Sequence, residues 1–144
     1  MSRIHAREAA FALLFEWESN KVPEHDPMTV LHESVDTVNI DENDLLYIGD
    51  LLSGCKANVE KLDAVIDRYS IEWRVERLPR ADLALLRLAI YEIMFSEDVP
   101  DAAVIDQCVD LAKKYSTEES GAFINGVLGS VVRVKNEQNA VSGN

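Results

Sequence analysis

Apolar residues recur every three or four positions along almost the whole chain, and this spacing is what most constrains its fold. The spacing matches the 3.6-residue period of an α-helix, whereas a half-buried strand needs strict alternation, which no segment shows. Only six glycines and four prolines interrupt the 144 residues, and no internal repeat of about 20–50 residues is visible. The sequence therefore predicts an all-α fold.

Breaking and capping residues divide the first half of this pattern into helices. We expect a first helix from Ser2 to Glu18 and a shorter one from Met28 to Val38. Asp41 is expected to cap a long third helix from Glu42 to about Tyr69, because its side chain can accept from the first free N–H groups.

The second half contains the segment expected at the centre of the domain. The helix from Arg80 to Phe95 is apolar on nearly all sides, which is typical of a fully buried helix. Ser116 and Glu119 have the capping-box spacing, and they are expected to open the last helix. In total we expect about seven helices in one domain over residues 1–135, followed by a polar, disordered tail over 136–144.

The charge restricts the partners of the chain. It carries 26 acidic against 14 basic residues, a formal charge of −12. Such a protein is repelled by phosphate backbones as a whole, so nucleic-acid binding needs a local basic patch or a partner that supplies positive charge. Acidic residues dominate the segment between Lys21 and Lys56, which contains no Lys or Arg and is not expected to hold RNA.

Several classes of function lack support in the sequence. The chain has no apolar run long enough for a membrane span and no secretory signal, and Cys55 and Cys108 are typical of a reducing cytoplasm. His5, His25 and His32 do not have metal-ligand spacing, and no glycine-rich phosphate loop is present. We therefore expect a cytoplasmic protein that is not an enzyme and has no metal or cofactor.

The first basic locus is at the N-terminus. Arg3 and Arg7 are spaced i, i+4, and the same stripe continues into Phe11 and Phe15. Cations beside aromatic residues suit RNA phosphates and stacked bases. The alternative is that both arginines lie over apolar neighbours or pair with acids such as Glu8.

A second basic locus contains four arginines, namely Arg74, Arg77, Arg80 and Arg87. Arg87 lies in an aliphatic run, where an unpaired guanidinium would be costly to bury. It is therefore paired with a carboxylate, Asp82 and Asp63 being the candidates, or it lies at the edge of a binding surface. Lys113 lies where a helix ends, and Phe123 flanks the apolar stripe of the last helix.

Four blocks of sequence, in order and together covering roughly residues 3 to 132, resemble the NusB family of bacterial transcription antitermination factors. They are Arg3-x-x-Ala6-Arg7-Glu8-Ala9-Ala10, Asp44-Leu45-Leu46-Tyr47, Leu85-Leu86-Arg87-Leu88-Ala89-Ile90-Tyr91-Glu92, and Ala103-Val104-Ile105-Asp106-Gln107 with Phe123-Ile124-Asn125-Gly126-Val127-Leu128. The resemblance implies an all-helical fold with two helical subdomains and no catalytic site.

The resemblance also implies partners. Family members bind boxA RNA in the leaders of ribosomal RNA operons together with NusE, a small-subunit ribosomal protein, and the heterodimer joins NusA, NusG and RNA polymerase. Matched position by position, the expected RNA-binding residues are Arg3, Arg7, Lys113 and Phe123. The residues expected at or near the NusE face are Phe15, Asp82 and Arg87. The alternative hypothesis is a helical protein–protein adaptor or a self-associating module, including a homodimer, with incidental RNA binding.

Overall fold

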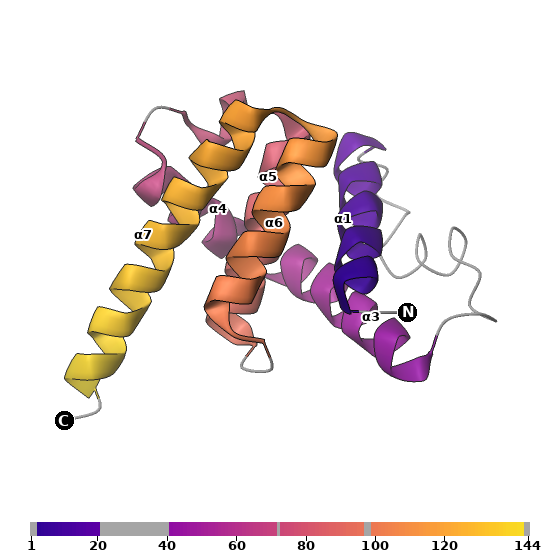
Figure 1. Ribbon diagram of the computed structural model, residues 1–144, viewed down its shortest axis with the longest axis horizontal. Helices are drawn as coiled ribbons and strands as arrows, with labels where there is room; N and C mark the ends of the chain where they lie inside the picture. The colour runs from indigo at the N-terminus through magenta and orange to yellow at the C-terminus, as the bar shows by residue number, and fades with distance from the viewer. Residues whose placement is uncertain (1–2, 21–40, 72, 97–98, 143–144) are drawn as a thin grey trace. The chain divides into compact units, whose positions relative to one another are not determined.

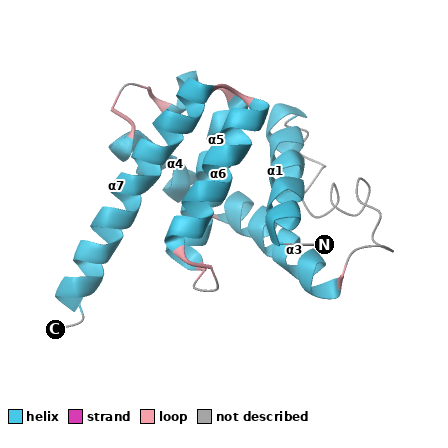
Figure 2. Ribbon diagram, in the orientation of Figure 1, coloured by secondary structure: helices cyan, strands magenta, loops and turns pink. Residues whose placement is uncertain are grey.

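The structure is a computed structural model that describes residues 3–20, 41–71, 73–96 and 99–142. These ranges contain α-helices and one short 3₁₀ turn, and no strand occurs among them (Figure 2). The prediction of an all-α fold is therefore confirmed. The helix expected from Met28 to Val38 lies outside the described residues. The chain divides into two compact units, Met1–Val59 and Glu60–Asn144, in agreement with two helical subdomains.

In the first unit, α1 (Arg3–Asn20) packs along α3 (Glu42–Ala57) (Figure 1). The apolar stripe of α1 is buried at Ala6, Ala10, Phe11, Leu13 and Leu14, and that of α3 at Ile48, Leu51, Leu52 and Cys55. Asp41 caps α3 as expected, since its Oδ1 accepts from the backbone N–H of Asn43 at 3.1 Å.

The expected long helix from Glu42 to Tyr69 is in fact two helices, and that prediction was wrong. α3 ends at Ala57, and α4 (Val59–Tyr69) begins two residues later. At Asn58 both the backbone N–H and the side-chain Nδ2 donate to the carbonyl of Gly54, at 3.0 and 2.8 Å. An asparagine side chain that competes for backbone groups in this way disfavours the helix interior, so Asn58 interrupts the run.

The second unit is built around α5 (Arg80–Phe95), which has the predicted bounds. Every residue of α5 from Asp82 to Ile93 is buried, as its apolar pattern predicted. α5 packs against both α6 (Asp101–Tyr115) and α7 (Glu118–Ser142), and those two helices also pack against each other (Figure 1).

A lysine joins the three helices around the α5–α6 connection. Lys135 of α7 donates through Nζ to the carbonyl of Ile93 at 2.7 Å and forms a 3.2 Å ion pair with Asp101. The cation thus satisfies a carbonyl in the last turn of α5, where helix C-termini favour positive charge.

Both ends of α7 differ from expectation. Thr117 caps the helix instead of Ser116, because Thr117 Oγ1 accepts from the Ser120 N–H at 3.0 Å. Ser116 ends α6 instead, where its N–H bonds the carbonyl of Ala112. The sequence predicted a disordered tail over 136–144, whereas α7 continues without a break through Ser142.

Candidate nucleic-acid interface

The first candidate residues lie near the start of α1. Arg3 is exposed, and its guanidinium carbon lies 3.9 Å from the centroid of the Tyr47 ring. Arg7 lies 5.7 Å from the same ring but is completely buried. Tyr47 of α3 therefore holds two cations through its ring face, and of these two only Arg3 is open to solvent.

Phe15 lies further along α1 and marks the exposed end of its apolar stripe. It is 37% exposed, and its ring centroid is 6.2 Å from that of the buried Phe11. An aromatic ring anchored on one side and open on the other is suited to a partner surface. The structure places Phe15 in the first unit, whereas Asp82 and Arg87 belong to the second.

Lys113 is exposed in the last turn of α6, and its stem crosses α7 at Gly121. A Cβ built on Gly121 would lie 3.0 Å from Lys113 Cγ and 3.2 Å from Cε. Gly121 therefore allows the lysine stem to pass close to the backbone of α7, which leaves the ammonium group at the surface.

Phe123 borders two adjoining cavities of the second unit. The Phe123 cavity has a volume of about 280 Å³ and is lined by Trp73, Arg77, Leu78, Pro79, Asp82, Ser116, Thr117, Glu119, Ser120 and Phe123. The Gly126 cavity has a volume of about 670 Å³ and is lined by Tyr69, Ile71, Trp73, Glu119, Ala122, Phe123, Gly126, Val127 and Ser130. The two cavities share Trp73, Glu119 and Phe123, so the two aromatic side chains lie at their junction.

The position of Trp73 is fixed by hydrogen bonds of the chain around it. Ser70 Oγ donates to the carbonyl of Trp73. The N–H of Val75, which opens the 3₁₀ turn Val75–Arg77, donates to Asp67 Oδ1 at 2.9 Å. These bonds tie the segment to the end of α4, while the indole of Trp73 remains 49% exposed.

Asp82 is buried beneath the Phe123 cavity, with 3% of its surface exposed. Its Oδ2 accepts from Ser120 Oγ at 2.8 Å, and that hydroxyl in turn bonds Ser116 and Thr117 at 2.9 and 3.1 Å. Through this hydroxyl cluster Asp82 holds the first turn of α7, and Phe123 lies in the next turn of the same helix.

Arg87 pairs with Asp63, which settles the choice that the sequence left open between Asp63 and Asp82. Its Nε and Nη2 donate to the two carboxylate oxygens of Asp63, each at 2.8 Å. Arg87 is 5% exposed and lies within α5, so the pair ties α5 to α4.

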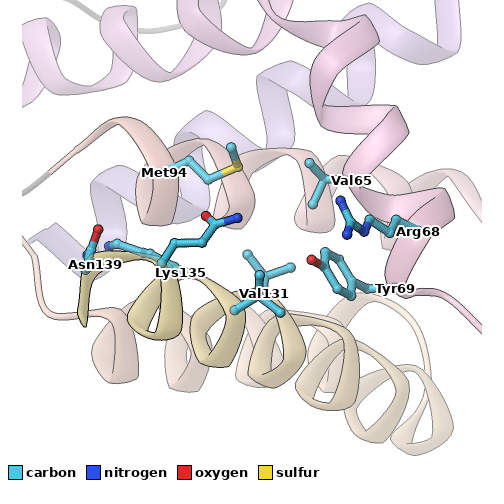
Figure 3. Close-up of a pocket in the computed structure, with 9 residues that line it drawn as sticks. Val65, Arg68, Tyr69, Met94, Val131, Lys135 and Asn139 are labelled. Atoms are coloured by element: carbon cyan, nitrogen blue, oxygen red, sulfur yellow. The ribbon is translucent and has the colours of Figure 1, made fainter. Parts of the chain in front are cut away.

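A third cavity, the Lys135 cavity, lies between α4, α5 and α7 and has a volume of about 390 Å³. Val65, Arg68 and Tyr69 of α4 lie across from Val131 and Lys135 of α7, with Met94 of α5 beside them (Figure 3). Its remaining lining residues are Val134, Gln138 and Asn139. No candidate residue from the sequence lies here.

The structure thus brings together only part of the predicted site. Phe123 and Asp82 line one cavity, Arg87 is in a separate ion pair, and Lys113 is not among the residues that line either of Phe123's cavities. Sequence reasoning missed Trp73 as a site residue. The available signal was a tryptophan directly followed by Arg74 and close to Arg77 in the locally basic stretch.

The described residues include neither a metal-binding cluster nor a membrane-spanning helix. They contain no group of three or more His, Cys, Asp or Glu side chains arranged to hold a metal ion. None of the helices described is both long and apolar enough to cross a bilayer.

Comparisons with known proteins agree on one family. The sequence matches the NusB family over residues 4–133. It is 41% identical to the transcription antitermination protein NusB of Acetivibrio thermocellus, over 94% of this chain and 91% of that protein. It is 39% identical to the NusB protein of Clostridium novyi, over 92% of this chain and 99% of that protein.

Solved structures give the same answer. NusB of T. maritima superposes with a TM-score of 0.85 at 34% identity, covering 92% of each chain. A chain in a crystal structure of the antitermination factors NusB and NusE with double-stranded RNA superposes with a TM-score of 0.80 at 28% identity, over 93% of this chain and 99% of that one. From its sequence and its fold alike, the chain belongs to the NusB family.

Proposed function

We propose that this protein binds boxA RNA in the leaders of ribosomal RNA operons as a heterodimer with NusE. As a member of the NusB family it is a transcription antitermination factor and not an enzyme. The related NusB and NusE proteins crystallised with double-stranded RNA support a composite RNA site formed with a partner.

The observation that carries the proposal is the Phe123 cavity. Phe123 and the half-exposed Trp73 provide ring faces, and the exposed Arg77 provides a cation at the same cavity. Sequence-specific RNA recognition uses unstacked bases held on aromatic side chains, with cations on the backbone. A cavity near 300 Å³ is also at the lower end of the range of small-ligand pockets, about 300–1,000 Å³.

The other proposed RNA-binding residues take different roles. Arg3 and Lys113 are exposed and are proposed to contact phosphates. Arg7 is buried against Tyr47, so its proposed part in RNA binding is to fix the start of α1, which presents Arg3. A protein of charge −12 needs more positive charge than these groups supply, and NusE is proposed to provide it.

The NusE face is proposed to include Phe15, Asp82 and Arg87. Phe15 is exposed and would contact NusE directly. Asp82 and Arg87 are buried and would act on that face by holding the first turn of α7 and the α4–α5 contact in place. The heterodimer is proposed to join NusA, NusG and RNA polymerase in the cytoplasm.

Fluorescence anisotropy with labelled boxA RNA tests the proposal directly. Titrations with boxA and with a scrambled RNA of the same composition, each with and without NusE, measure affinity and specificity. We expect weak binding by this protein alone and tighter, boxA-specific binding when NusE is present. Equal affinities for boxA and scrambled RNA in the presence of NusE would overturn the proposal.

A further inference from the structure

The three cavities of the second unit follow one another along α7, and together they are called the groove. The Phe123 and Gly126 cavities share Trp73 and Phe123, and the Gly126 and Lys135 cavities share Tyr69. From Phe123 to Lys135 the groove follows about 18 Å of helix, at 1.5 Å per residue. We propose that this groove is a track for unpaired RNA, along which a strand continues past the Phe123 cavity; this inference rests on the proposed function.

The side chains along the groove suit single-stranded RNA. Tyr69, Trp73 and Phe123 provide three aromatic rings at its junctions, while Arg77 lies at one end. Sites for unpaired strands combine rings on which bases stack with cations that follow the backbone.

The far end of the groove repeats this combination. In the Lys135 cavity the Arg68 guanidinium carbon lies 5.6 Å from the centroid of the Tyr69 ring, and the amides of Gln138 and Asn139 complete the lining. A planar cation beside an aromatic ring can stack on a base or contact a phosphate.

The groove is less acidic than the chain as a whole. The residues that line the Lys135 cavity include no acid, and its exposed cation is Arg68, since Lys135 is paired with Asp101. The only acids that line the other two cavities are Glu119 and the buried Asp82. In a sequence with 26 acidic and 14 basic residues, a phosphate backbone meets less repulsion in this groove than over the chain as a whole.

Gly126 lines the middle of the groove. A Cβ built on Gly126 meets no atom within 4 Å, so packing within the protein does not require a glycine there. A glycine in a helix interior is less favourable than an alanine. Close approach of a bound strand to the backbone of α7 would account for its presence.

Gly129 provides a matched control on the same helix. Its Cβ would also meet no atom within 4 Å, and it lines none of the three cavities. Gly126→Leu fills the groove, whereas Gly129→Leu adds the same side chain outside it. Both changes raise helix propensity, so both variants should fold.

The experiment measures RNA affinity in the presence of NusE by fluorescence anisotropy. The RNAs are boxA alone and boxA extended by a few unpaired nucleotides at its 5′ or at its 3′ end. In the wild type, an extension at one end should tighten binding. Gly126→Leu should remove that gain, roughly 5- to 150-fold for one stacked base, and leave the affinity for boxA alone unchanged. Gly129→Leu should behave as the wild type.

Each other outcome overturns the inference in a recognisable way. If boxA binds and neither extension tightens binding, the proposal that the groove binds unpaired RNA is wrong, while the proposed function stands. If Gly126→Leu weakens the capture of NusE and leaves RNA affinity unchanged, the groove belongs to a protein partner. If boxA does not bind at all, the proposed function fails and the track fails with it.

Discussion

The guanidinium of Arg87 in α5 donates two parallel hydrogen bonds, each 2.8 Å long, to the carboxylate of Asp63 in α4. The Arg87 side chain is 7% exposed and the Asp63 side chain 26%. Two matched donors and acceptors in this geometry form the strongest kind of side-chain ion pair. The pair explains how a charged residue is tolerated in the most apolar helix of the chain.

Asp63→Asn should therefore destabilise the protein, because it leaves the buried guanidinium without its carboxylate. Breaking a buried pair from one side costs about 3–5 kcal/mol, and we expect about 3 kcal/mol because Asp63 is partly exposed. Urea unfolding followed by circular dichroism measures the change. Asp110→Asn, at an exposed site on α6, is the control. A loss of under about 0.5 kcal/mol for Asp63→Asn, the size typical of surface substitutions, would contradict the assignment.

The prediction from sequence was most accurate for α5, where the apolar pattern and the local helix-start signal agree. The bounds of α5 were correct because Pro79 precedes it, and an apolar pattern on all sides leaves no alternative to burial. The break at Asn58 and the cap at Thr117 were missed because each depends on one local hydrogen bond. Asn58 Nδ2 donates to the Gly54 carbonyl, and Thr117 Oγ1 accepts from the Ser120 N–H. Periodicity averages over several turns and does not resolve such bonds.

The candidate site was predicted residue by residue, but its geometry was not. The sequence predicted Arg3 and Arg7 to be equivalent cations. In the structure both lie near the Tyr47 ring, but Arg3 is exposed and Arg7 is buried. Trp73 and Phe123 are 50 positions apart, and only the fold brings them to one cavity. Contacts of such separation carry no periodic signal in a single sequence.

The difference between Arg3 and Arg7 yields a prediction for RNA binding. Arg3→Ala should lower the slope of log affinity against log salt concentration by about 0.7, the value for one phosphate contact on a single strand. Its fold should be unaffected, since the side chain is exposed. Anisotropy titrations with boxA RNA and NusE at several salt concentrations measure the slope. Lys61→Ala, an exposed cation on α4 outside the proposed site, should leave it unchanged.

Arg7→Ala should act on stability instead, because Arg7 is completely buried and lies near the Tyr47 ring. We expect a loss of about 2 kcal/mol in the free energy of unfolding, within the range for buried polar side chains that lose their contacts. Urea unfolding checks this value. A variant as stable as the wild type that nonetheless loses salt dependence would show that Arg7 contacts RNA directly.

Ser120→Ala tests whether the hydroxyl cluster positions Phe123. The change removes the hydroxyl that donates to Asp82 Oδ2 and leaves this buried carboxylate oxygen without a donor, which costs about 1–3 kcal/mol. We expect lower stability and weaker boxA binding with an unchanged salt slope, since no cation is lost. Asn125→Ala, an exposed change on the same helix, is the control. Normal RNA affinity in Ser120→Ala would separate the cluster from the proposed RNA site.

Phe15→Ala should weaken NusE binding without unfolding the protein. The ring is 37% exposed, so its truncation removes little core, whereas aromatic anchors at interfaces contribute about 2 kcal/mol or more, roughly 30-fold in affinity. Calorimetric titration with NusE measures the affinity, and a thermal melt checks the fold. Leu46→Ala removes a still more exposed apolar side chain, at 65%, from α3 of the same unit and should have no effect. If Leu46→Ala weakens NusE binding and Phe15→Ala does not, the partner face lies on α3 instead of α1.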